Sequence, residues 1–407
     1  MQGKLNKLFL IFAAFALAIL PPALPTHAEA DLKVIDNKAV IEYPGYIYFE
    51  LELEGPVKVV DVRLNYCVGR DSFVDVVCEA VADIGDDALS ASWKWDMATT
   101  GNLPPGSVVT YWWKITTADG VSCETQPKDV TFDDYRYQWQ RQNISEGSLT
   151  LFWYRGNHQF ALELMDAAQE ALKQLEADMG ALLVRPVKIY IYGNSSDLQG
   201  AVLYAQEWTG GLAFTGYGVV AIGVAPSNLE WGKRAVVHEL AHLVTHQMTY
   251  NPYNSIPVWL NEGISMHAEG KMDEIYEASL KRALLANELI SVKSLSSPFS
   301  TDADIAHLSY AQSQSLVEYL INEYGSQKME ELLAVFRRGC TYDEGFLEVY
   351  GFDTKALDDS WQDYIKQQYG ISAPREMNVI PLCLNSSLVI VAILVAAGVM
   401  RRKRQAV

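Results

Sequence analysis

Basic residues are scarce in this chain of 407 residues, which has 32 Lys and Arg against 50 Asp and Glu and a formal net charge of −18. Proteins that bind nucleic acid contact the phosphates through a basic surface, so this balance argues against a nucleic-acid partner. The excess of acidic charge is better explained by solubility. Hydrophobic residues make up 49% of the chain, which is enough for sizeable cores. At this length we expect two folded parts.

Cysteine is also scarce, and its spacing lacks the paired C-x-x-C units of cysteine-built zinc sites. The five cysteines are Cys67, Cys78, Cys123, Cys340 and Cys383. The first three lie in the N-terminal third, where an oxidising compartment would allow one disulfide. We predict a bond between Cys67 and Cys78, because a short hairpin would place them opposite each other.

The N-terminus has the features of an exported protein. Lys4 and Lys7 precede an apolar run from Leu8 to Leu20, and Ala28-Glu29-Ala30 follows as a small-x-small cleavage site. These features predict that residues 1–30 are a secretory signal peptide.

The C-terminus has the features of a membrane anchor. Residues 379–400 are almost entirely apolar, which is long enough to cross a bilayer, and four basic residues follow at once. A buried C-terminal element would not normally end on such a cluster. We therefore predict a single transmembrane helix at 379–400, a cytoplasmic basic tail at 401–407, and a folded part that lies outside the cell membrane.

Residues 31–133 carry short runs of β-branched and aromatic residues between turn sequences. The clearest runs are Val57–Leu64, Phe73–Val77 and Val108–Ile115, and Pro104-Pro105-Gly106 is one of the turns. Regular strands with turn signals predict a small β-sandwich. Nothing in this region has the spacing of a catalytic motif, so a structural or binding role is expected.

The pattern changes in residues 134–375. Strand-like runs at Leu149–Tyr154 and Val187–Tyr192 flank a segment from Phe160 to Met179 whose apolar residues recur every three to four positions, as on one face of a helix. Gly211–Val224 is again β-rich, and the remainder of this part is mostly helical. The predicted fold class is therefore α+β, with an N-terminal β-sandwich, a second domain of a small sheet and many helices, and the C-terminal transmembrane helix.

One motif in the helical part carries chemistry. His238-Glu239-Leu240-Ala241-His242 has the form HExxH, and on a helix its two histidines share one face and can reach one metal ion. Glu239 would then lie beside a metal-bound water and take its proton. HExxH alone also arises by chance on amphipathic helices. Two histidines leave zinc short of protein ligands, so a third is expected.

The third ligand is not the next histidine in the series. His246 would lie about 12 Å along the helix axis from His238, too far for one ion. The metzincin pattern also fails, because Thr245 and Met248 stand where it needs Gly and His. Glu262 is the better candidate, because a carboxylate on a second helix completes a His2Glu set and leaves a fourth position for water. Without the upstream motif it would be read as a surface glutamate.

These two motifs together point to a family. HELAH (238–242) followed by WLNEGIS (259–265) resembles the gluzincin clan, and most closely the peptidase MA-like superfamily of zinc metallopeptidases. The segment SYAQS (309–313) also resembles a part of that superfamily. The resemblance covers about residues 148–369. It implies a zincin-like fold, in which a small sheet lies over the active-site helix and the lower half is mostly helical.

The resemblance also implies roles for individual residues. It gives a Zn²⁺ cofactor three ligands, namely His238, His242 and Glu262. Glu239 would be the general base, and Tyr310 would hydrogen-bond the oxyanion that forms when water attacks the carbonyl. From sequence alone Tyr310 is equally a core tyrosine on an amphipathic helix. His307 and Tyr324 are lesser candidates for the oxyanion role.

The chain departs from the family in two places. The GxMEN motif by which the zinc aminopeptidases hold a substrate's N-terminus is absent, and Thr209–Phe214 takes roughly its place, either aligning a peptide backbone or forming a glycine-rich turn. The Asp expected four residues after the ligand Glu is replaced by Met266. Glu269 is a weak candidate for the acid that orients a ligand histidine.

We therefore predict a membrane-anchored, outward-facing zinc metallopeptidase that hydrolyses a peptide or protein substrate. The absence of GxMEN leaves endopeptidase and aminopeptidase action open, and the oligomeric state is also open. The alternative is a surface binding protein with a degenerate peptidase fold. The intact set of two histidines and two glutamates argues against it.

Overall fold

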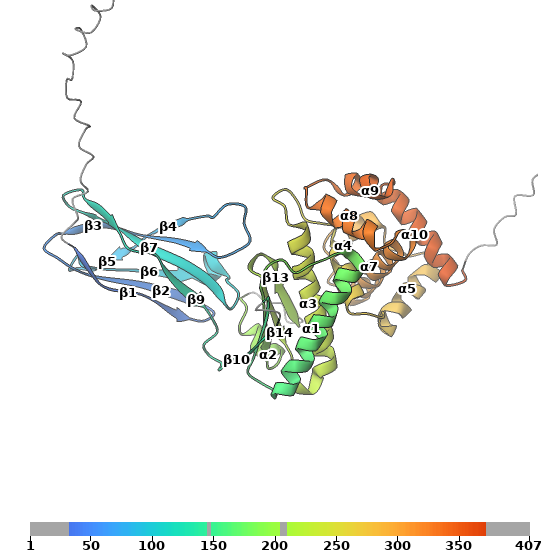
Figure 1. Ribbon diagram of the computed structural model, residues 1–407, viewed down its shortest axis with the longest axis horizontal. Helices are drawn as coiled ribbons and strands as arrows, with labels where there is room; N and C mark the ends of the chain where they lie inside the picture. The colour runs from blue at the N-terminus through green and yellow to red at the C-terminus, as the bar shows by residue number, and fades with distance from the viewer. Residues whose placement is uncertain (1–31, 145–147, 204–209, 372–407) are drawn as a thin grey trace, which may run out of the picture.

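The computed structural model describes residues 32–144, 148–203 and 210–371. They form a β-rich N-terminal region and a helical C-terminal half that lie side by side along the long axis of the molecule (Figure 1). The structure is therefore of mixed α+β class, and the predicted fold class is corrected below.

The N-terminal region consists of two antiparallel sheets. The first has the order β1-β2-β6-β5 and is built from β1 (Lys33–Glu42), β2 (Tyr46–Glu54), β6 (Ser90–Asp96) and β5 (Asp83–Ile84). The second has the order β4-β3-β7-β8, with β9 also on β7, and is built from β3 (Val59–Val68), β4 (Cys78–Val81), β7 (Ser107–Thr117), β8 (Ser122–Glu124) and β9 (Lys128–Phe132). Alternate apolar residues of both sheets share one core. The Phe49 and Tyr111 rings meet there edge to face at 4.8 Å.

Two local predictions in this region are wrong. Phe73–Val77 is not a strand but part of the loop between β3 and β4, because no neighbouring strand pairs with it among the described residues. Cys78 lies opposite Tyr66, so strand alternation turns the adjacent Cys67 to the other face of the sheet. These two cysteines therefore cannot form the predicted disulfide, and both are free thiols.

A third sheet connects the two halves of the molecule. Its order is β10-β11-β12-β14-β13, from β10 (Gln140–Ile144), β11 (Leu149–Trp153), β12 (Val187–Tyr192), β14 (Val219–Gly223) and β13 (Gly211–Phe214). Strand β12 is buried on both faces apart from Lys188, as its mostly apolar sequence requires. Ile189 and Ile191 enter the core of the helical half, whereas Tyr190 and Tyr192 enter the core of the N-terminal region.

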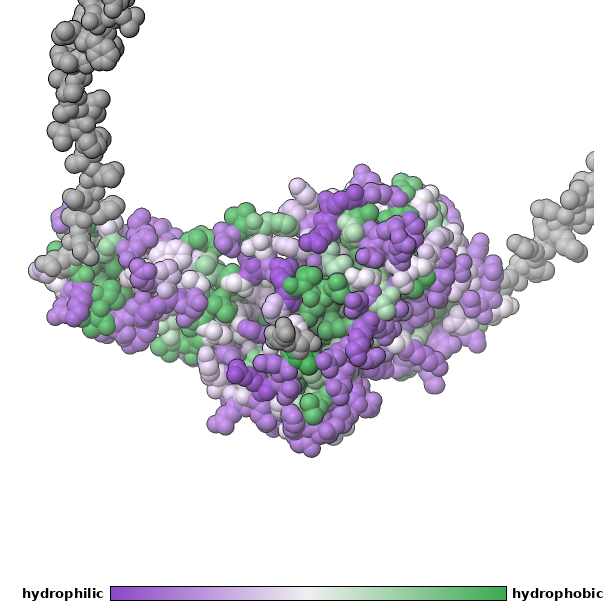
Figure 2. Space-filling view, viewed as in Figure 1, coloured by the Kyte–Doolittle hydropathy of each residue, from purple (hydrophilic) through white to green (hydrophobic). Residues whose placement is uncertain are grey.

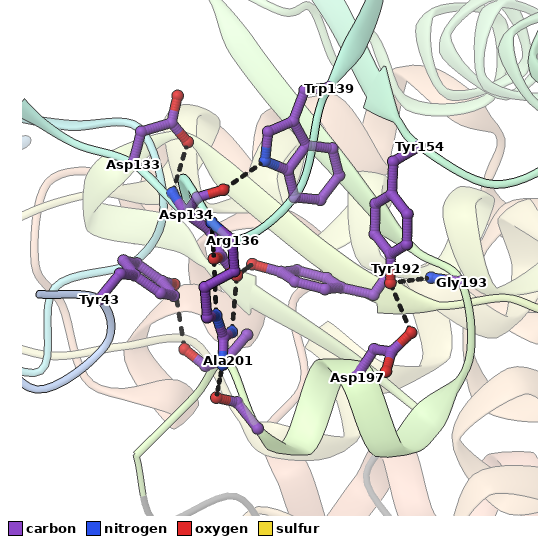
Figure 3. A network of polar contacts seen from close by, with 11 residues as sticks. Tyr43, Asp133, Asp134, Arg136, Trp139, Tyr154, Tyr192, Gly193, Asp197 and Ala201 are labelled. Carbon is purple, nitrogen blue, oxygen red and sulfur yellow. Dashed lines mark hydrogen bonds and ion pairs between the residues drawn. The ribbon is translucent and has the colours of Figure 1, made fainter.

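Polar contacts reinforce this junction (Figure 3). Asp134 has no exposed side-chain surface, pairs with Arg136, and accepts a hydrogen bond from the Tyr192 hydroxyl at 3.2 Å. The Tyr43 hydroxyl, on the N-terminal region, donates to the Ala201 carbonyl at 3.0 Å, and Arg136 donates to the Gly200 carbonyl at 2.9 Å. The buried carboxylate is thus compensated by charge and by hydrogen bonds, which fixes one half on the other.

The helices pack on the opposite face of the third sheet and below it. The longer ones are α1 (His158–Met179), α3 (Leu229–Thr249), α4 (Val258–Ala268), α5 (Glu274–Ala286), α7 (Ala303–Tyr324), α8 (Ser326–Phe336), α9 (Tyr342–Tyr350) and α10 (Thr354–Gln368). Short helices are α2 (Ser195–Gln199) and α6 (Val292–Leu295). Helices α1 and α3 contact each other and share a core with β12 and β14.

The predicted fold class needs one correction, which is its transmembrane helix. Within the described ranges no helix combines the length and apolar character needed to cross a membrane. The predicted span at 379–400 lies outside the described residues, as do the predicted signal peptide (1–30) and basic tail (401–407).

Candidate metal centre

Helix α3 carries HExxH at the boundary between the sheet and the lower helices. Val236, Leu240 and Leu243 anchor its buried side. His238 and His242 lie one turn apart on another side, with 17% and 12% of their side chains exposed. The four-residue spacing therefore does what the sequence predicted and directs both imidazoles to one point.

Glu262 on α4 completes a group of three potential ligands. The Nε2 atoms of His238 and His242 are 3.2 Å apart, and they lie 3.4 and 3.6 Å from Glu262 Oε2. Ligand atoms about 2.1 Å from a tetrahedral ion stand about 3.4 Å from one another, so the three positions fit one zinc ion. Two imidazoles and one carboxylate are also a zinc donor set. In the described part of the chain, this is the one group of three such residues that fits a metal ion.

Two further side chains hold the histidines in this orientation. Glu269 Oε1 lies 2.7 Å from His238 Nδ1, and Ser265 Oγ lies 3.1 Å from His242 Nδ1. Each contact uses Nδ1 and leaves Nε2 facing the other ligands. Arg234 in turn donates from Nε to Glu269 at 3.0 Å. Sequence reasoning missed Ser265, although its place three residues after Glu262 puts both on one face of α4.

The charges around the site favour a cation. Burial alone would lower the pKa of His238, but hydrogen bonds to Glu262 and Glu269 raise it to about 10. Burial pushes the pKa of Glu262 upward, but the neighbouring His242 and His238 hold it below its usual value. Burial raises the pKa of Glu239. Glu262 and Glu269 thus stabilise positive charge beside them, whether it is a proton on His238 or a bound cation.

We expect a Glu269→Gln variant to bind zinc about 10- to 100-fold more weakly, because it weakens the contact that orients His238. Zinc affinity measured by competition with a chelating dye checks this. Glu288→Gln, a change of the same kind at an exposed position, is the matched control and should leave the affinity unchanged. If both variants bound zinc with equal affinity, Glu269 would have no role in holding the metal.

Glu239 faces the edge strand of the third sheet. A Cβ atom placed on Gly211 would lie 2.8 Å from Glu239 Oε1, so glycine at the start of β13 gives the carboxylate its room. Strand β13 is the last strand in the sheet order, and its residues are half-buried. The predicted backbone-aligning segment Thr209–Phe214 thus includes a true edge strand, although Thr209 itself lies outside the described residues.

Tyr310 on α7 also reaches the site. Its ring centre is 6.5 Å from that of His238, and Phe299 packs edge to face against it at 5.2 Å. Burial, with the nearby Glu262 charge, raises the pKa of Tyr310 and keeps its hydroxyl a donor. His307 contacts Tyr276 rather than the ligands, and Tyr324 packs against Tyr319, Tyr350 and Phe352.

His246 lies apart from the metal centre, as its position along the helix predicts. Its Nε2 atom is 4.0 Å from Asp71 Oδ2, and it is not in the group of potential ligands. Burial lowers the pKa of His246, which favours the neutral ring.

The glycine after Glu262 sets how closely α4 approaches α7. A Cβ atom on Gly263 would lie 2.3 Å from the Ser313 carbonyl oxygen, so the helix carrying Glu262 could not keep this distance with a larger residue. We expect Gly263→Ala to destabilise the fold by about 1–3 kcal/mol through overpacking. Thermal unfolding checks this against Gly45→Ala, where the nearest atom is at an ordinary 3.8 Å. Equal melting temperatures would contradict the packing argument.

One of three comparisons with known proteins indicates a superfamily for the helical half. A comparison with curated proteins gave no match. Among solved structures, the chain is similar to an aminopeptidase N family protein from Idiomarina loihiensis, at 12% identity and a TM-score of 0.24, over 85% of this chain and 57% of that one. OgpA from Akkermansia muciniphila is similar at 13% identity and a TM-score of 0.19, over 25% of this chain and 28% of that one. Likenesses of this size do not establish a common fold.

The family model described as Peptidase MA superfamily matches residues 167–367. This range contains α3, α4 and α7, and so every residue of the candidate centre. The helical half of the chain is therefore similar to the Peptidase MA superfamily, which indicates a peptidase-like fold.

Proposed function

We propose that this chain is a zinc-dependent peptidase that hydrolyses peptide bonds with water and without a covalent intermediate. The observation that carries the proposal is the convergence of His238, His242 and Glu262 beside a further carboxylate, Glu239, and a sheet edge that no other described strand covers. A purely structural ion pair would not need this set of donor types. The superfamily match over residues 167–367 supports the reaction class.

Three side chains would hold the ion and two more would keep them in place. His238 and His242 would bind through Nε2, and Glu262 through Oε2, while Glu269 and Ser265 fix the two rings. A zinc ion bound there supplies Lewis-acid chemistry, polarising the scissile carbonyl and making water acidic enough to attack.

Glu239 would act as the general base. Burial raises the pKa of Glu239, which makes its carboxylate a stronger base toward the water proton that it must take and later return. In the reaction a water O–H proton moves to Glu239 while the oxygen bonds to the carbonyl carbon. The C–N bond then breaks, and the proton passes from Glu239 to the leaving amine. Tyr310, kept protonated, would donate a hydrogen bond to the oxyanion.

Strand β13 would align the substrate. A peptide that adds to a free sheet edge gains main-chain hydrogen bonds along its length. Gly211 sits against Glu239, so a peptide paired with β13 would pass directly by the base.

The proposal is tested by cleavage profiling of the full chain on a peptide library, with and without a chelator. We expect cleavage at defined bonds that stops with chelator and returns when zinc is restored. Zinc binding without cleavage of any peptide would contradict the proposal and would favour a binding protein with a peptidase-like fold.

A further inference from the structure

We propose that the loop of residues 69–77, called the β3–β4 loop, binds an apolar side chain of the substrate about five residues to the amino-terminal side of the scissile bond. This inference rests on the proposed function, because it assumes that a peptide lies along β13. It goes beyond that function by assigning part of the specificity to the N-terminal region.

The β3–β4 loop exposes an unusual amount of apolar surface. Phe73, Val74, Val76 and Val77 are between 52% and 73% exposed, although their sequence resembles that of a buried strand. In Figure 2, hydrophobic residues lie along the upper edge of the molecule where the N-terminal region meets the helical half. Contiguous apolar groups of this kind on a soluble domain mark binding sites.

Contacts with the helical half hold the loop in place. The Asp71 amide donates to the Gly216 carbonyl at 2.6 Å, and the Tyr250 hydroxyl donates to the Asp71 carbonyl at 3.1 Å. The Asp71 carboxylate forms an ion pair with Arg185, and the Phe73 ring stacks on Tyr250 at 4.9 Å and 15°. The apolar side chains are therefore presented by an anchored loop, so that binding them would require little further ordering.

The anchor points lie on the path of a peptide along β13. Gly210 at one end contacts the Trp231 ring near the start of α3, Gly211 contacts Glu239, and Gly216 accepts the hydrogen bond from the loop. Asp71, which donates that hydrogen bond to Gly216, also accepts one from Tyr250 just after the end of α3. The strand and the active-site helix thus run in the same direction. From Glu239 to Tyr250 the helix rises about 16 Å, which an extended peptide covers in about five residues.

The direction of the peptide decides which side of the scissile bond meets the loop. Antiparallel pairing is the more stable of the two arrangements, and β13 already pairs in this way with β14. A peptide antiparallel to β13 has its amino-terminal side toward Gly216 and the β3–β4 loop.

The chemistry of the loop favours a peptide over a membrane. Asp75 stands between Val74 and Val76, and the chain as a whole carries a net charge of −18. Surfaces that bind anionic lipids surround their apolar residues with Lys and Arg. An apolar peptide side chain requires no such basic rim.

Peptide binding to the full-length Glu239→Gln chain tests the inference, because the substitution removes the proposed base while leaving the binding surface. Fluorescence polarisation would compare labelled peptides that carry Leu or Ser at each upstream position. We expect about tenfold tighter binding for Leu near the fifth position, from burial of half its side chain. Adding Val74→Asp should bring this ratio to within about twofold. Val40→Asp, at an exposed valine of β1, is the matched control and should preserve it.

The possible outcomes separate this inference from the proposed function. The loop proposal would be overturned if the peptides showed no preference for Leu over Ser on the amino-terminal side, or showed one only on the carboxyl-terminal side. It would also be overturned if Val74→Asp left the preference intact. So would binding to phosphatidylglycerol vesicles that Val74→Asp abolishes while the peptide ratio stays unchanged. Cleavage by the unmodified chain is measured separately. Its absence contradicts the peptidase proposal alone, whereas cleavage without the preference contradicts the loop proposal alone.

Discussion

Replacing Glu239 by Gln should lower kcat/KM for peptide hydrolysis by about 10²- to 10⁴-fold while zinc still binds at one ion per chain. The amide has nearly the shape of the carboxylate and can still sit against Gly211. It cannot accept a proton from water, so the step that creates the nucleophile is lost. Peptidase assays and metal analysis on the same preparation measure both quantities.

Glu230→Gln is the control for this variant. Glu230 lies on the same helix, but its side chain is 85% exposed and pairs with Lys233 near the helix start. We expect this change to leave hydrolysis within about twofold, as exposed ion pairs contribute little. Full activity in Glu239→Gln with zinc bound would exclude Glu239 as the base.

Replacing His242 by Ala should remove both zinc and hydrolysis. The variant keeps only His238 and Glu262 of the three ligands, and two protein ligands do not hold a zinc ion well. The loss of zinc affinity should exceed the 10- to 100-fold expected for Glu269→Gln, because a ligand is removed rather than a residue that orients one. Zinc titration with a competing dye measures the affinity.

His246→Ala is the matched control on the same helix and in the same four-residue series. His246 lies 4.0 Å from Asp71 and outside the metal centre, so zinc affinity should not change. Retention of zinc by His242→Ala together with its loss from His246→Ala would mean that a different set of residues binds the metal.

Those residues of the metal centre that the helical repeat or a short motif identifies were predictable from the sequence. The four-residue spacing of His238 and His242 fixes a shared helix face, and the same rise along the helix excludes His246. Glu262 followed from the WLNEG motif and from the need for a third ligand. The structure brings these residues together with Tyr310, and their chemical roles stay predictions.

Long-range contacts were not predictable, because no local pattern encodes them. Tyr192, for example, meets Asp134 across 58 positions. Glu269 meets His238 across 31 positions, and the sequence indicated it only as a weak candidate. The strand assigned to Phe73–Val77 failed for a related reason. Its residues have the propensity for a strand, but a strand forms only where a partner edge is in register. These residues instead form an exposed loop, which leaves their apolar side chains accessible.

Titration of the full chain with zinc, followed by hydrolysis of a cleavable library peptide, measures whether hydrolysis depends on the bound ion. We expect hydrolysis to rise in proportion to bound zinc, to reach a plateau at about one ion per chain, and to stay near zero at every point in Glu239→Gln. Binding of one zinc ion per chain with no hydrolysis of any peptide, or hydrolysis that is unaffected by removing zinc, would contradict this expectation.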